Sequence, residues 1–193
     1  SVSQEELQST ARTISNARKV YVVGYRASAV PATYFGYLLK KIHNNVTIDT
    51  TFSWEICDAI ARDPDESVIF ALAFRRYSRK VIEFLEYARQ YNIKIIGFTD
   101  NFLSPLINVS DQYTVVDMTG VSFVDPLAHV ITYLGALIHE IAFRDTENVI
   151  KSLEKFEDNV KLQREFLLDD SPAVLMPESD NPKKWMAGEP WAF

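Results

Sequence analysis

The sequence predicts an α/β protein with a three-layer, doubly wound, flavodoxin-like fold around a five-stranded parallel sheet, and with extra helices at both ends. Short, apolar, β-branched runs alternate with longer segments of helical periodicity. The runs are apolar on both faces, which is typical of strands buried in a parallel sheet. Right-handed crossovers between such strands place helices on both sides of the sheet.

The elements are expected in the following order. Ser3 and Glu6 form a capping box ahead of an apolar stripe, so a leading helix is expected over 3–17. The expected strands are 19–24, 46–49, 67–72, 93–98 and 112–116. The helical segments expected after them are 29–42, 54–61, 78–91, a short turn opened by Ser104-Pro105, and a long helix opened by Asp125-Pro126.

We expect four segments along the chain: a leading helix over 1–17, a binding domain over 18–145, an amphipathic helix over 146–168, and a tail over 169–193. The third segment carries an apolar seam at nearly heptad spacing, which predicts a homodimer or higher homo-oligomer. Its members are Val149, Leu153, Phe156, Val160 and Leu167. The tail contains several prolines and two tryptophans, and we leave open whether it is disordered or docks on a second subunit.

Composition excludes several classes of protein. The chain has 193 residues, 47% hydrophobic and 24% charged, which is enough to build one sizeable core. Its net charge of -6 has the wrong sign for a surface that neutralises nucleic-acid phosphates. The single cysteine, Cys57, excludes an internal disulfide, and no segment is long and apolar enough to be a membrane span or signal peptide. We therefore expect a cytoplasmic protein, and we interpret the start at Ser1 instead of Met as a boundary left by processing.

In doubly wound folds, ligands bind where the strands end. That rule selects five loops: 24–28, 50–53, 73–78, 99–104 and 117–125. In the first, Gly24 ends a buried strand and Arg26 offers a guanidinium group. Ser28 is placed to cap the next helix and also to donate to a phosphate or a sugar hydroxyl. On this loop alone, a structural and a ligand-binding role are equally supported.

The third loop gathers positive charge at the start of a helix. Arg75, Arg76, Arg79 and Lys80 lie within six residues, and this placement opposes the helix dipole unless an anion or carboxylate lies among them. We expect Arg79 and Lys80 to face solvent, and Arg75, Arg76 and Ser78 to face the crevice.

Histidines and carboxylates supply weak candidates for catalysis. His129 is expected one turn into the last sheet helix, near the crevice. His139 and Glu140 follow at the far end, roughly 20 Å from the start of that helix, so they would serve only from a neighbouring subunit. The sequence has no HExxH motif, nucleophile elbow, Walker A loop or metal-ligand cluster, so we expect no metal and no cofactor.

Two loop motifs carry a family resemblance over about two thirds of the chain, from Ala17 to Arg144. The region resembles a SIS (sugar isomerase) domain, most closely the effector half of RpiR/MurR-type bacterial transcriptional regulators. The first motif of that family, G-x-G-x-S, is kept at Gly24 and Ser28, with Arg26 in place of the second glycine. The second motif of that family is Ser-x-Ser-Gly-x-Thr. Here Ala73, Arg75 and Arg76 replace its two serines and its glycine, and Ser78 replaces its threonine.

The loops are similar to those of a subset of these regulators, which read Gly-x-Arg-Ala-Ser and Phe-x-Arg-Tyr, followed by Thr-Asp and Ser-Pro. Thr99 and Ser104 begin the last two pairs here. The resemblance implies a phosphosugar ligand. A sugar acid or another small anion stays open as well, because arginine binds carboxylate groups as well as phosphate groups. The resulting candidate ligand-binding residues are Gly24, Arg26, Ser28, Arg75, Arg76, Ser78, Thr99 and Ser104.

Three functions remain open at this point. The first is a ligand-sensing effector domain, which binds DNA only through an N-terminal helix-turn-helix domain absent from this chain. The second is a phosphosugar aldose-ketose isomerase, with His129, His139 and Glu140 as the candidate acids and bases. The third is an interaction module that binds no ligand.

Overall fold

The computed structural model describes residues 3–118 and 126–163. The chain divides into two units, Ser1–Ser152 and Leu153–Phe193. The first contains the whole sheet. Of the second, the described residues form the end of one helix.

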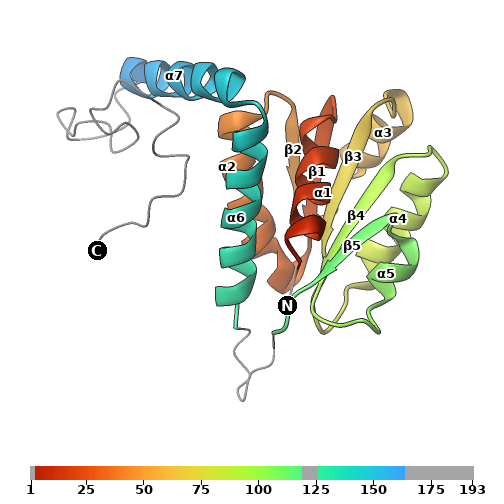
Figure 1. The fold of residues 1–193 in the computed structure, drawn as a ribbon. Coiled ribbons are helices and arrows are strands. Elements are labelled where there is room, and N and C mark those ends of the chain that lie inside the picture. The colour runs from red at the N-terminus through yellow and green to blue at the C-terminus, as the bar shows by residue number, and fades with distance from the viewer. Residues whose placement is uncertain (1–2, 119–125, 164–193) are drawn as a thin grey trace. The chain divides into compact units, whose positions relative to one another are not determined.

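Five parallel strands form a single sheet in the order β2-β1-β3-β4-β5 (Figure 1). This is the flavodoxin-like order, which confirms the predicted fold class. The strands are β1 (Lys19–Gly24), β2 (Val46–Asp49), β3 (Ser67–Leu72), β4 (Lys94–Thr99) and β5 (Gln112–Val115).

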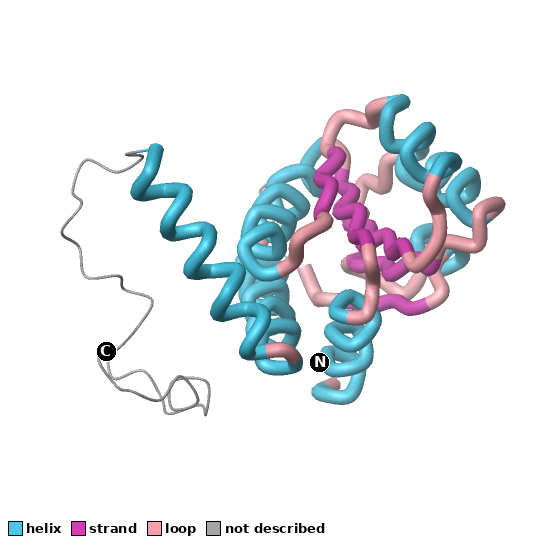
Figure 2. Tube along the Cα trace, turned by 90° about the horizontal axis from the view of Figure 1, so that it is seen from above, coloured by secondary structure: helices cyan, strands magenta, loops and turns pink. Residues whose placement is uncertain are grey.

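Helices cover both faces of the sheet (Figures 1 and 2). One face packs against α1 (Gln4–Ser15), α2 (Ala29–Ile42) and α6 (Ala128–Arg144), and the other against α3 (Trp54–Arg62), α4 (Arg79–Arg89) and α5 (Pro105–Val109). The remaining elements are a short 3-10 turn, η1 (Arg26–Ser28), and α7 (Thr146–Gln163).

Each face has its own apolar core, because alternate residues of a strand point to opposite sides. Val22 and Phe70 pack with α2 and α6 on one side, whereas Tyr21 and Ile69 pack with α3 and α4 on the other. All four side chains are almost fully buried. Burial on both faces explains why the strands read as continuous apolar runs.

The helix ends follow local chemistry. The capping box at the start of α1 is present: the Ser3 hydroxyl accepts from the Glu6 N–H, and the Glu6 carboxylate accepts from the Ser3 N–H. The last sheet helix begins at Ala128, later than predicted. Asp125, expected to open it, lies outside the described residues, as do Leu167 and the tail over 169–193.

The apolar seam of α7 is only partly available for another chain. Val149 is 4% exposed and is therefore already buried within its own chain. Leu153, Phe156 and Val160 are partly exposed.

Candidate functional site

A cavity of about 960 Å³ lies between the loops that follow β1 and β3. We call it the loop pocket. It brings together five of the predicted site residues: Arg26, Ser28, Arg75, Arg76 and Ser78. The other lining residues are Tyr25, Ala27, Leu72, Ala73, Phe74, Tyr77 and Val81.

Strand register places these two loops side by side. In the β1–β3 pair, Gly24 is the partner of Leu72, so both strands end at the same level and their loops start together. Gly24 also lets the chain turn sharply into η1 and α2. A Cβ at this position would lie 2.5 Å from the Ser28 carbonyl oxygen and 2.8 Å from the Ala32 Cβ.

Ser28 joins the first loop to the third. Its hydroxyl oxygen accepts a hydrogen bond from the Phe74 backbone N–H at 3.2 Å, and the side chain is buried. Ser28 is at the N-cap position of α2 but makes no side-chain capping bond there, so the structure gives no support to the capping role that was left open for it. Arg26 precedes it with φ 57°, a left-handed conformation that is uncommon outside glycine.

Arg75 and Tyr77 of the third loop both contact Asp100, the residue after β4. The Arg75 Nε lies 3.8 Å from Asp100 Oδ2, and the Tyr77 hydroxyl donates to Asp100 Oδ1 at 3.0 Å. Burial, reinforced by this carboxylate, raises the pKa of Tyr77. Tyr77 therefore stays a neutral donor at physiological pH.

The buried carboxylate of Asp49 supports the loop after β1. The Asp49 side chain accepts the backbone N–H groups of residues 51–53, and also the Tyr25 hydroxyl at 3.3 Å. Burial and the negative charge of Asp49 raise the pKa of Tyr25 well above its ordinary range. This network of hydrogen bonds fixes the position of Tyr25, the residue before Arg26.

The lining of the loop pocket is suited to an anion. Its ionisable side chains, among the described residues, are three guanidinium groups and two phenols. As expected, Arg79 and Lys80 do not line it; both are exposed, and Lys80 lies over the Phe52 ring with its Nζ 5.6 Å from the ring centroid. Guanidinium groups bind phosphate and carboxylate groups well through paired hydrogen bonds.

Thr99 and Ser104 do not line the loop pocket. Thr99 is fully buried and its hydroxyl donates to the Ala73 carbonyl oxygen at 2.7 Å. The buried Ser104 caps α5, where its hydroxyl accepts from the Leu106 N–H. In these positions both residues brace the loops around the pocket.

The weak catalytic candidates also lie elsewhere. His129 is exposed, with its Nδ1 3.0 Å from the Asp117 carbonyl oxygen. His139 is exposed further along α6, and Glu140 pairs with Arg144 at 3.7 Å. Within the part of the chain that the structure describes, no imidazole or carboxylate lines the loop pocket, so the isomerase alternative gains no general base there.

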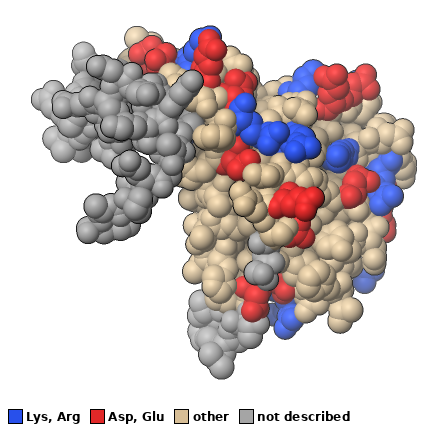
Figure 3. Space-filling model, in the orientation of Figure 1, with Lys and Arg blue, Asp and Glu red and all other residues tan. Residues whose placement is uncertain are grey.

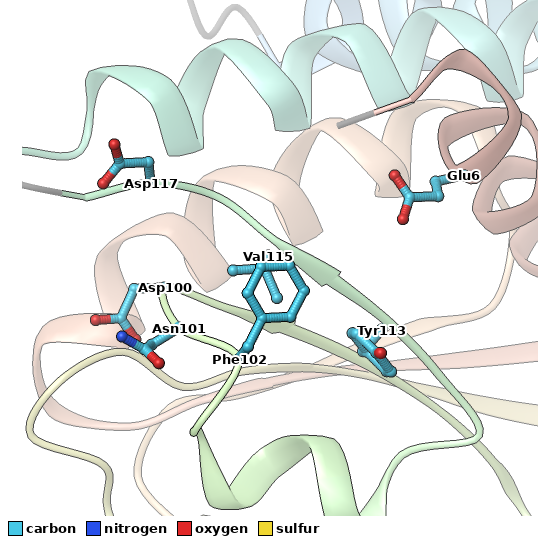
Figure 4. A pocket seen from close by; sticks show the side chains of 7 residues that line it. All are labelled: Glu6, Asp100, Asn101, Phe102, Tyr113, Val115 and Asp117. Carbon is cyan, nitrogen blue, oxygen red and sulfur yellow. The ribbon is translucent and has the colours of Figure 1, made fainter. Parts of the chain in front are cut away.

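A second, smaller hollow of about 290 Å³ lies beside β5, and its lining is acidic (Figure 4). Glu6 comes from α1, Asp100 from the turn after β4, and Asp117 from the segment after β5. Phe102 and Tyr113 cover part of its wall. Three carboxylates disfavour an anionic ligand, so the two cavities differ in the charge of the side chains that line them.

On the face in Figure 3, Lys and Arg side chains lie among Asp and Glu side chains. Within residues 3–118 and 126–163, no group of three or more His, Cys, Asp or Glu side chains is placed to hold a metal ion. No helix in these ranges is long and apolar enough to cross a bilayer.

The strand order and the position of the loop pocket place this chain among the doubly wound α/β proteins. A family model narrows the class: the SIS domain matches residues 13–130. The chain belongs to the SIS domain family.

Individual relatives are similar over different lengths. An uncharacterized HTH-type transcriptional regulator from Clostridium perfringens is 30% identical over 99 residues, which are 51% of this chain. The match spans only 35% of that regulator's length.

Solved structures share the fold. The sugar isomerase domain of an RpiR transcription factor from Sphaerobacter thermophilus has a TM-score of 0.75, with 23% identity over 81% of this chain and 87% of that chain. The NanR protein of Vibrio vulnificus, complexed with ManNAc-6P, has a TM-score of 0.70, with 18% identity over 83% of this chain and 62% of that chain.

Sequence reasoning missed Asp49 and Asp100 as parts of the site. Asp49 lies in no motif named above, and Asp100 is the second residue of the Thr-Asp pair, to which no role at the site was assigned. Each acts through contacts to loops distant in the sequence. The signal available was position: Asp49 ends one strand and Asp100 follows another, and both therefore lie at the edge where ligands bind.

Proposed function

We propose that this chain is the ligand-sensing domain of an RpiR-type transcriptional regulator and that a small anionic metabolite binds in the loop pocket. The observation that carries the proposal is the convergence of Arg26, Arg75 and Arg76 on one cavity where the strands end. Ser28 and Ser78 line the same cavity and supply hydroxyl groups.

Phosphosugar is the ligand class that these groups fit best. A phosphoryl group carries nearly two negative charges at neutral pH and accepts paired hydrogen bonds from guanidinium groups. The cavity, at about 960 Å³, also has room for a sugar ring. The structural relative NanR is complexed with such a compound, ManNAc-6P.

Regulation of transcription requires a second part. The match to an HTH-type regulator over 35% of its length supports an arrangement in which a helix-turn-helix domain outside this sequence binds the DNA. With its net charge of -6, the present chain is suited to sensing and not to wrapping DNA. The working protein would then be cytoplasmic.

We extend the proposal to the segments of the chain. Residues 18–145 bind the ligand, and the helix over 146–168 pairs with a second copy through Leu153, Phe156 and Val160. Ligand binding would shift the arrangement of two subunits and thereby of their DNA-binding domains.

Isothermal titration against a panel of phosphosugars, sugar acids and their uncharged parent sugars tests the proposal. We expect at least one phosphosugar to bind, its parent sugar to bind at least tenfold more weakly, and Arg76→Ala to lose most of the affinity. Arg62→Ala, which removes an exposed arginine of α3, is the matched control and should bind like wild type. Absence of binding by every compound, or equal binding by Arg76→Ala, would overturn the proposal.

A further inference from the structure

Asp100 stands between the two cavities. It contributes to the wall of the acidic hollow, beside Asn101 (Figure 4). Its carboxylate also contacts two residues that line the loop pocket, Arg75 and Tyr77. One carboxylate therefore adjoins both the basic and the acidic cavity.

The two side chains of the Arg75–Asp100 pair differ in how free they are to move. The Asp100 side chain is only 8% exposed, and the Tyr77 hydroxyl fixes its Oδ1 at 3.0 Å. The Arg75 side chain is 71% exposed, and its Nε lies at 3.8 Å from the carboxylate, near the limit of an ion pair. Arg75 can thus move to another anion while Asp100 keeps its place.

We infer that Asp100 is a positioning residue that competes with the ligand's anionic group for Arg75. This inference rests on the proposed function, because it concerns the same loop pocket. A bare anion must draw Arg75 away from Asp100 and approach a fixed negative charge. A ligand that also carries sugar hydroxyls gains contacts that offset this cost, so Asp100 makes the pocket discriminate against simple anions.

The test compares binding of inorganic phosphate and of the phosphosugar that binds in the titration panel. Asp100→Asn keeps an oxygen that can accept from Tyr77 but removes the negative charge. We expect phosphate to bind this variant about two- to fivefold more tightly than wild type, the range typical of a partly exposed ion pair. The phosphosugar should gain less, so the ratio of the two affinities falls.

A double-mutant cycle separates competition from a structural role. In an Arg75→Ala background, Asp100→Asn should change phosphate affinity far less than in wild type, because the competed group is gone. Asp65→Asn, an exposed aspartate at the opposite edge of the sheet, controls for the change in net charge and should behave like wild type. Thermal unfolding of each variant shows whether it remains folded.

The outcomes distinguish the two proposals. If wild type binds neither phosphate nor any phosphosugar, the proposed function fails and this inference fails with it. If wild type binds but Asp100→Asn matches it, only the inference is overturned. An equal gain in the presence and absence of Arg75 also overturns it, since the carboxylate would then act on the pocket without competing for that side chain.

Discussion

The hydroxyl oxygen of Ser28 accepts a hydrogen bond from the backbone N–H of Phe74 at 3.2 Å, and this bond ties the loop after β1 to the loop after β3. Both residues are buried. The two loops supply all three arginines of the loop pocket. The shape of the pocket therefore depends on a bond that is not itself made to a ligand.

Replacing Ser28 tests that dependence. Ser28→Ala leaves the buried Phe74 N–H without its acceptor, so the free energy of unfolding should fall by about 1–3 kcal/mol. Chemical denaturation measures this loss. Ser9→Ala, at an exposed position of α1, should change the same quantity by less than about 0.5 kcal/mol. A Ser28→Ala protein as stable as wild type would contradict the bridging role.

Two glycines of the chain differ in the space around them. Gly24→Ala places a methyl group 2.5 Å from the Ser28 carbonyl oxygen, so the variant should lose about 1–3 kcal/mol of stability through overpacking. Gly135 lies in α6, where an added methyl group would meet no neighbouring atom within 4 Å. Gly135→Ala should therefore gain up to about 1 kcal/mol from higher helix propensity. Equal effects at the two positions in thermal unfolding would contradict the packing described around Gly24.

The raised pKa of Tyr25 predicts that the free energy of unfolding falls as the pH becomes alkaline. Its pKa in the folded protein is raised above the ordinary value of 10.0, chiefly by burial and then by Asp49. The neutral phenol therefore contributes stability that is fully present below about pH 10 and lost as the pH rises further, because the unfolded chain ionises first. Denaturation curves from pH 9 to 11 should show a shallower decline for Tyr25→Phe, by up to about 1.4 kcal/mol per pH unit. Parallel declines for the two proteins would exclude this network as the cause.

Self-association through α7 can be tested at Leu153. If this helix pairs with a second copy, Leu153→Glu places a charge in an apolar seam and should weaken the dimer at least tenfold. Sedimentation equilibrium measures the dissociation constant. Lys155→Glu changes charge at an exposed position of the same helix and should leave most of the dimer intact. A monomeric wild-type chain would refute the proposed pairing.

The fold could be predicted because each strand is locally distinctive. Runs such as 19–24 and 67–72 are apolar on both faces, and the structure has strands with those bounds. The end of α4 was less predictable: the helical pattern continued to Tyr91, whereas the helix ends at Arg89. Helix ends depend on local hydrogen bonds that periodicity does not encode.

Only part of the site could be predicted. The positions of the strand ends indicate some of its residues, whereas others take part through contacts between loops that are distant in the sequence. Arg26, Arg75 and Arg76 were found because the ends of parallel strands lie together. The partner of Ser28 could not be found in this way, because Phe74 is 46 residues distant and the bond depends on how the two loops turn. For the same reason the roles of Asp49 and Asp100 could not be predicted, because their contacts cross from one strand to the next.

Amide NMR during titration with a bound phosphosugar locates the ligand on the folded chain. If the ligand occupies the loop pocket, the largest shifts should fall on the backbone amides of residues 25–28 and 74–78, and Arg76→Ala should abolish them at the same ligand concentration. Shifts centred instead on Asn101 and Tyr113 would place the ligand in the acidic hollow. Either that result or the absence of any shift would contradict an anion-sensing site formed by the loops after β1 and β3.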